Sequence, residues 1–157
     1  MRVFGQLCLL GAFVSSGYAA FACLLGWLRG QHAVVRSGVF AAVVGFGGLT
    51  ATVGVLGWAL VAKDFSFKYV TQYSSWLLGW HYSLSALWVG QAGSLLLWAW
   101  FSGLLAVTYF FWPRVARSPL REGTLGVSMA YVCFLLTIMV FGADPMQPSL
   151  VIPKDGA

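Results

Sequence analysis

The chain has 157 residues, of which 60% are hydrophobic, 17% aromatic and only 8% charged, and its mean hydropathy is +0.84. A water-soluble domain carries about 25% charged residues, and a chain this short cannot bury so much apolar surface by itself. The composition excludes an ordinary soluble enzyme, a disordered segment and a disulfide-rich secreted domain, and it predicts an integral membrane protein. The net charge of +5 forms no block of like charges, so we expect no nucleic-acid partner.

Four segments are long and apolar enough to cross a bilayer, and none of them contains a charged residue. A spanning helix needs about 20 apolar residues, because the hydrocarbon core is about 30 Å thick and each residue rises about 1.5 Å. The segments lie at residues 3–28, 37–62, 93–112 and 123–143. They do not alternate polar and apolar residues as barrel strands do, so they predict helices. The predicted fold is an all-α integral membrane protein with a single membrane domain over residues 1–157.

The first span has an alternative interpretation as a signal peptide, with Arg2 as the basic region and residues 20–22 as the cleavage site. The apolar region of a signal peptide is about 7–15 residues long. This run continues to Leu28, so we expect a retained helix.

The distribution of Lys and Arg predicts the orientation, because short cytoplasmic loops are enriched in positive charge. The short loops 29–36 and 113–122 contain five arginines, whereas Arg2, Lys63, Lys68 and Lys154 are spread over three longer pieces. We therefore expect both termini, the loop 63–92 and the tail 144–157 outside the cytoplasm. In a bacterium this corresponds to a multi-pass protein of the inner membrane with both termini in the periplasm.

The loop 63–92 is much more aromatic than a spacer between spans. If residues 73–88 form a helix, side chains at steps of three or four share one face: Trp76, Trp80, Leu84 and Leu87. Such a segment is expected to lie in the membrane interface with its rings at the level of the headgroups. An aromatic belt explains this pattern, and a shelf that holds a flat hydrophobic ligand is the second interpretation.

The sequence offers no catalytic residue and no metal site. No acidic residue or lysine lies within a span, and the three cysteines, Cys8, Cys23 and Cys133, form no CxxC pair. The two histidines, His32 and His81, fall in loops expected on opposite sides of the membrane. They therefore cannot ligate one haem iron together.

The most distinctive motif begins where the aromatic loop turns into the third span. Residues 88–98 read WVGQAGSLLLW, with tryptophans at both ends. Gly90 and Gly93 leave the backbone bare, which permits a tight turn and the close approach of another backbone or ligand. Ser94 is expected to cap the new helix through its hydroxyl.

This motif resembles the WGxxEGSLLLW motif of the CcmF-type haem lyases of cytochrome c maturation. Residues 64–70, DFSFKYV, are similar to the DFSVxYV of that family, and residues 73–75 stand where it has an NSN-like stretch. The tail 144–156 resembles a variant of the family's NPFxR…P…DG segment. Ala92 replaces the usual glutamate and Ser83 stands where Lys or Arg is common, which removes two charges from the loop.

The resemblance covers nearly the whole chain and implies the N-terminal quarter or so of such a protein. In the full-length family an LNPLLQ-like stretch, further helices, the tryptophan-rich WWD loop and the haem-ligand histidines follow, and none of these occurs within the 157 residues. The resemblance thus implies a membrane subunit that supports covalent attachment of haem to apocytochrome c. Its implied partners are a second CcmF-type chain bearing the WWD loop and the haem-ligand histidines, and other cytochrome c maturation proteins.

Under this interpretation haem is handled by the assembled complex, and the isolated chain is expected to bind none. The outer-loop residues most expected to matter are Trp76, Trp80, His81, Trp88, Gly90, Gly93, Ser94 and Trp98. The alternative is a non-catalytic membrane anchor of a respiratory or electron-transfer complex, which explains the aromatic helices equally well but should show haem or quinone ligands within the spans.

Overall fold

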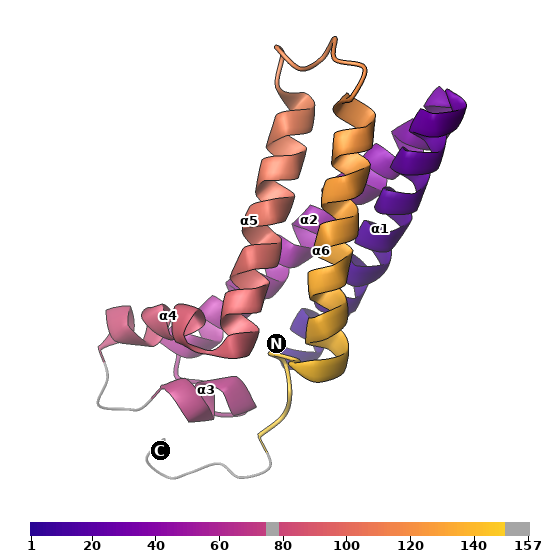
Figure 1. Cartoon of the computed structure of the whole chain (residues 1–157). Helices are drawn as coiled ribbons and strands as arrows, with labels where there is room; N and C mark the ends of the chain where they lie inside the picture. The colour runs from indigo at the N-terminus through magenta and orange to yellow at the C-terminus, as the bar shows by residue number, and fades with distance from the viewer. Residues whose placement is uncertain (75–78, 150–157) are drawn as a thin grey trace.

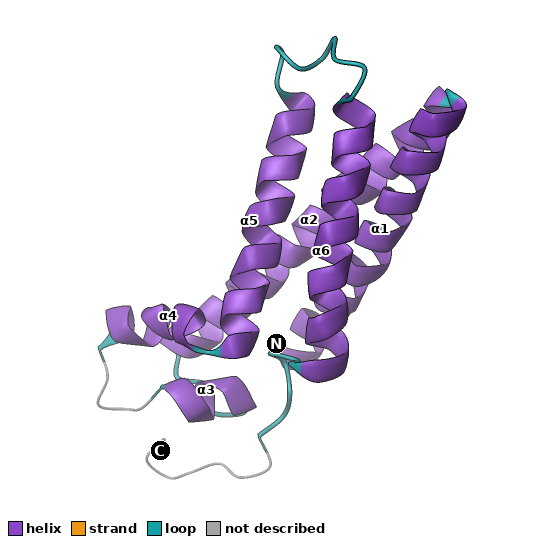
Figure 2. Cartoon of the chain, in the orientation of Figure 1, coloured by secondary structure: helices purple, strands orange, loops and turns teal. Residues whose placement is uncertain are grey.

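A computed structural model of the chain describes residues 1–74 and 79–149, and its regular elements are helices (Figures 1 and 2). In chain order they are α1 (Arg2–Arg29), α2 (His32–Val61), α3 (Lys68–Tyr73), α4 (Trp80–Val89), α5 (Gln91–Phe111) and α6 (Arg121–Gly142). Four of them, α1, α2, α5 and α6, are long and apolar enough to cross a membrane. The predicted all-α membrane fold is confirmed, and the chain is a multi-pass membrane protein.

The four long helices pack side by side into one bundle (Figure 1). Helix α1 packs along α2 and α6, and α5 packs against α6 and α2. Small buried residues line the seam between α1 and α2, where they let the two backbones approach closely: Ala12, Ala19, Gly38, Ala42 and Gly45. Larger buried side chains such as Leu49, Leu56 and Leu136 fill the centre. The core is therefore a helix–helix interface within the membrane.

One end of the bundle carries the short connections between helices. Gly30, in the left-handed conformation at φ 64°, ends α1 and lets the chain turn directly into α2. The loop between α5 and α6 returns to the same end, where the indole N–H of Trp27 donates a 2.8 Å hydrogen bond to the Pro119 carbonyl. Arg121 donates a 2.8 Å hydrogen bond to the Phe110 carbonyl and lies 3.8 Å from the centre of the Phe110 ring. This end holds five arginines: Arg29, Arg36, Arg114, Arg117 and Arg121.

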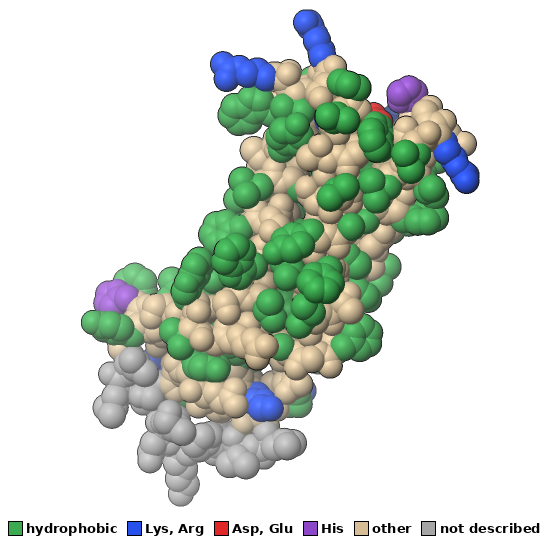
Figure 3. Space-filling view, viewed as in Figure 1, with side chains coloured by type: hydrophobic (Ala, Val, Ile, Leu, Met, Phe, Trp, Pro, Cys, Tyr) green, Lys and Arg blue, Asp and Glu red, His purple; other side chains and the backbone are tan. Residues whose placement is uncertain are grey.

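The opposite end carries the two short helices and both described ends of the chain (Figure 1). Here the segment after α6 is hydrogen-bonded to the segment before α3 and to the first residue of α3. The Lys68 N–H donates to the Gln147 carbonyl at 3.0 Å, and the Ser149 N–H donates to the Ser66 carbonyl at 3.0 Å. In Figure 3 the blue Lys and Arg side chains lie towards the two ends, and the middle of the bundle is covered mainly by apolar and uncharged groups.

The continuous helix expected over residues 73–88 is wrong, because two short helices are present instead. Helix α3 ends at Tyr73, and Ser74 is extended at φ −134° and ψ 150°. Gly79 is extended as well, and α4 begins after it at Trp80. The buried hydroxyls of Ser74 and Ser83 lie 3.2 Å apart and share a hydrogen bond. This polar contact folds α3 back beside α4, which a single straight helix could not do.

The expected common face of this segment is also wrong. Trp80 and Leu84 are exposed on α4, whereas Leu87 is buried and belongs to the core. Trp88, two turns after Trp80, continues the exposed row. Trp76 lies outside the described residues.

Candidate functional site

The two glycines of the motif, Gly90 and Gly93, lie at a corner formed by α3, α4 and the first turn of α5, and a buried tyrosine occupies its centre. The Tyr69 side chain projects from α3, and its hydroxyl donates a 2.8 Å hydrogen bond to the Ala86 carbonyl of α4. The backbone N–H groups of Gly90 and Gly93 also face this hydroxyl oxygen. One phenol thus joins three consecutive helices.

Both motif glycines are required by the position of this tyrosine. A Cβ atom on Gly90 would stand 2.6 Å from Cε2 and Cζ of Tyr69. A Cβ atom on Gly93 would stand 2.9 Å from Tyr69 Cζ and would also overlap the Leu87 carbonyl oxygen. Real Cβ atoms essentially never approach that closely. The close approach expected at the two glycines is therefore made within the chain, by Tyr69.

The environment of Tyr69 keeps its hydroxyl protonated. The pKa of this phenol is raised from 10.0 to about 12, chiefly by burial; the N–H groups of Gly90 and Gly93 lower it and the neighbouring Tyr73 raises it, each to a smaller extent. The Tyr73 ring centre lies 4.9 Å from that of Tyr69. An ordinary phenol is already protonated at neutral pH, and the raised pKa lets Tyr69 remain a donor to Ala86 at higher pH as well.

Ser94 does not cap α5, contrary to expectation. The helix begins at Gln91 and its N-cap is Gly90, so Ser94 lies within the first turn. Its hydroxyl donates back to the Gly90 carbonyl at 2.8 Å. The reason is that Gly90 is extended and ends α4, which lets α5 start before the serine.

The tryptophans singled out in the sequence face outwards and do not gather around Tyr69. Trp80, Trp88 and Trp98 are 59%, 62% and 59% exposed. His81 is exposed too, and its ring centre lies 4.1 Å from that of Trp80. Trp80, His81 and Trp88 therefore form part of the outer surface of this end of the bundle, whereas Trp98 faces outwards from the second turn of α5.

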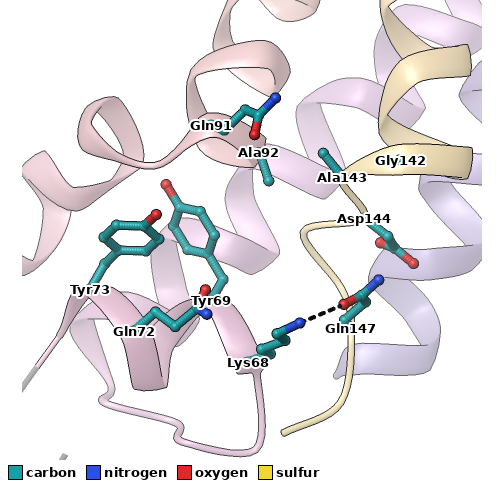
Figure 4. Close-up of a pocket in the computed structure, with 10 residues that line it drawn as sticks. All are labelled: Lys68, Tyr69, Gln72, Tyr73, Gln91, Ala92, Gly142, Ala143, Asp144 and Gln147. Carbon is teal, nitrogen blue, oxygen red and sulfur yellow. Dashed lines mark hydrogen bonds between the residues drawn. The ribbon is translucent and has the colours of Figure 1, made fainter. Parts of the chain in front are cut away.

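A polar hollow of about 230 Å³ opens beside the Tyr69 corner (Figure 4). Its lining comes from α3, the start of α5, the end of α6 and the segment that follows it: Lys68, Tyr69, Gln72, Tyr73, Gln91, Ala92, Gly142, Ala143, Asp144 and Gln147. The Lys68 ammonium donates a 3.3 Å hydrogen bond to the Gln147 side-chain oxygen. Ala92, which stands where the family motif has glutamate, lies on this wall. Sequence reasoning did not single out Tyr69 or Gln147, although Tyr69 lies within the quoted DFSFKYV segment.

The two histidines are far from one another. His32 begins α2 at the arginine-rich end, whereas His81 lies on α4 at the other end. Figure 3 shows the two purple histidine side chains at opposite ends of the molecule. Both are exposed. One iron cannot be held between them, so the described residues do not fit a bis-histidine haem site.

Comparison with known proteins relates this chain to a protein family. The chain is 36% identical over 153 residues to the cytochrome c-type biogenesis protein CcmF of Pseudomonas aeruginosa, covering 97% of this chain and 23% of that protein. It is 34% identical over 113 residues to the probable cytochrome c-type biogenesis protein NrfE of Escherichia coli, covering 72% of this chain and 20% of that protein. The chain is homologous to the N-terminal part of the CcmF family.

A solved structure agrees with the CcmF relationship. The fold matches a structure named cytochrome c haem lyase CcmF with a TM-score of 0.78 at 25% identity, over 93% of this chain and 24% of that one. No family model matches the chain. The chain spans about a quarter of the length of the CcmF proteins that it matches.

Proposed function

We propose that this chain is a membrane subunit equivalent to the N-terminal part of a CcmF-type haem lyase, and that it supports covalent attachment of haem to apocytochrome c. The observation that carries the proposal is the agreement of sequence and fold over the same residues, 97% of the chain in one comparison and 93% in the other. Because these residues correspond to about a quarter of a CcmF protein, the activity belongs to a larger assembly.

The ligands for haem come from the rest of that assembly. The described residues of this chain do not bring two imidazoles together, since His32 and His81 lie at opposite ends of the bundle. We therefore assign the WWD loop and the haem-ligand histidines to a second CcmF-type chain, which works with other cytochrome c maturation proteins. The comparisons do not favour the alternative of an anchor for a respiratory complex.

The role of this chain is to support the part of the outer surface that lies next to the haem site of the assembly. Tyr69 locks α3, α4 and α5 into one corner, and this corner fixes the outward direction of Trp80 and Trp88. The bundle itself supplies four membrane helices against which the remaining helices pack. No residue of the chain is assigned a catalytic step.

The orientation proposed here places the arginine-rich end in the cytoplasm and the Tyr69 corner in the periplasm of a bacterial inner membrane. Single cysteines test it after the three native cysteines are replaced by alanine. Cysteines at Ser66 and Ser149 should react with an impermeant thiol reagent added to the periplasmic side. Cysteines at Arg36 and Ser118 should react only after the membrane is opened, and the reverse pattern would overturn the orientation.

The function is tested by deletion and by co-purification from the native bacterium. Removal of this chain should abolish covalent haem attachment to c-type cytochromes, read as loss of haem staining in denaturing gels, and a plasmid copy should restore it. A tagged chain purified in mild detergent should bring down a CcmF-type chain that carries the WWD loop. Normal haem staining in the deletion strain would contradict the proposal.

A further inference from the structure

A groove runs between α5 and α6 on the outside of the bundle, within the two spans. Its volume is about 660 Å³, and five side chains that carry a hydroxyl line it together with apolar ones. One of them, Thr124, donates its hydroxyl to the Leu120 carbonyl at the start of its own helix. Of the other four, Ser102 and Tyr109 come from α5, and Ser128 and Tyr131 come from α6. The two tyrosines are 39% and 48% exposed.

These four hydroxyls differ from most others in the spans because they form no hydrogen bond with another described residue. Thr50, Thr52 and Thr137 each donate to the carbonyl four residues earlier, at 2.8 to 2.9 Å. The Tyr18 and Ser37 hydroxyls lie 3.0 Å apart and bond to each other. Across the described part of the four spans, six hydroxyls have no hydrogen-bond partner: Ser15, Ser102, Thr108, Tyr109, Ser128 and Tyr131. Five of these six are on α5 and α6, and four of them line the groove.

The groove lies deep in the membrane, where a hydroxyl without a hydrogen bond is unfavourable beside lipid. Tyr131 follows the first residue of α6, Arg121, by ten residues, which is about 15 Å along a helix that rises 1.5 Å per residue. That distance is about half of a 30 Å hydrocarbon core. Lipid tails offer no hydrogen bond, and an unsatisfied polar group there is unfavourable. Tyr109 is near the end of α5 and can reach towards the headgroups, whereas Tyr131 cannot.

We infer that the groove between α5 and α6 is the docking site for a transmembrane helix from the remaining part of the CcmF-type assembly. The inference rests on the proposed function, because about three quarters of the solved CcmF chain lies outside the part that this chain matches. The occupant presents small and hydrogen-bonding side chains, which fit between the tyrosines and bond to their hydroxyls. A second hollow, of about 290 Å³ and lined by Phe4, Ala51 and Trp58 among others, contains no hydroxyl and suits lipid tails.

Substitutions in the groove test the inference by the amount of CcmF-type partner recovered with the tagged chain. Ser128→Leu fills the groove and should lower recovery at least about fivefold, as expected of overpacking at a helix interface. Tyr131→Phe removes one hydroxyl and should lower recovery about threefold, the effect of one interhelical hydrogen bond. Ala51→Leu fills the apolar hollow and should leave recovery unchanged. Equal recovery for all three variants would overturn the inference.

A photo-cross-linker gives a second readout in living cells. Tyr131 is replaced by p-benzoylphenylalanine, which keeps an aromatic ring at an exposed position, and Trp58 is replaced in the same way as a control. The probe at 131 should cross-link to a membrane-spanning peptide of a CcmF-type chain, whereas the probe at 58 should give lipid adducts.

The outcomes separate this inference from the proposed function. Lipid adducts alone at 131, or a cross-link to an unrelated protein, would overturn the docking site. If the CcmF-type chain still co-purifies in that case, the proposed function stands and only the groove is misassigned. If it does not co-purify, both fail.

Discussion

The substitution Gly93→Ala should disrupt the corner that joins α3, α4 and α5. The added Cβ atom would lie 2.9 Å from Cζ of Tyr69 and would overlap the Leu87 carbonyl oxygen. The tyrosine can swing away, at the expense of its hydrogen bond to Ala86. The carbonyl belongs to the backbone of α4, so it can move only if the helix shifts relative to α5.

The expected loss of stability follows from these contacts. Overpacking of a well-packed site costs about 1–3 kcal/mol, and a lost hydrogen bond costs about 0.5–1.5 kcal/mol. Alanine in place of glycine within a helix recovers about 0.5–1 kcal/mol. We therefore expect Gly93→Ala to lower the free energy of unfolding by about 2 kcal/mol.

A matched control and a second glycine sharpen this experiment. Gly54 is also helical, and a Cβ atom there meets nothing within 4 Å, so Gly54→Ala should be neutral or stabilising. For Gly90 the three nearest atoms all belong to Tyr69. In a Tyr69→Ala background Gly90→Ala should therefore become nearly harmless, whereas Gly93→Ala should still be destabilising because the Leu87 carbonyl remains.

The free energies are measured in mixed micelles, with the unfolding detergent titrated and tryptophan fluorescence recorded. The double substitutions give the coupling energy between each glycine and Tyr69. If Gly93→Ala were as stable as Gly54→Ala, the motif glycines would not serve close packing, and the physical reason given for them would be refuted.

Three further predictions concern the pH response, haem and the arginine-rich end. Because the pKa of Tyr69 is raised to about 12, the stabilising effect of this phenol should be complete below pH 10 and should decline as the pH rises towards 12. Absorbance at 295 nm should show the phenol titrating at a higher pH than in a denatured sample. A parallel loss of stability in Tyr69→Phe over the same pH range would contradict this prediction. The chain purified by itself should carry no stoichiometric haem, and a bis-histidine absorption spectrum that disappears in His81→Ala would refute this. Arg121→Lys keeps the charge but cannot keep both the hydrogen bond to the Phe110 carbonyl and the stacking on its ring. Its free energy of unfolding in detergent should therefore fall by about 1 kcal/mol, which a lower thermal midpoint would report. An unchanged midpoint would show that charge alone matters there.

The sequence by itself determined the membrane class, the four long helices and the relation to the CcmF family. Each of these properties can be inferred from local sequence. A bilayer requires a continuous run of apolar residues, and a helix satisfies its backbone hydrogen bonds within that run, so no knowledge of distant contacts is needed. The glycines of the WVGQAGSLLLW motif likewise predicted that another group packs closely against the backbone there.

Only the tertiary structure decided what approaches these glycines and how the aromatic loop folds. A bare backbone shows that space is needed, but it does not identify Tyr69, more than 20 residues earlier, as the group that fills it. Helical periodicity over residues 73–88 could not reveal the break at Ser74, because the hydrogen bond between Ser74 and Ser83 forms only when α3 lies beside α4. The same packing buries Leu87 and leaves Trp80 outside, since the buried face of a short helix is chosen by its neighbours.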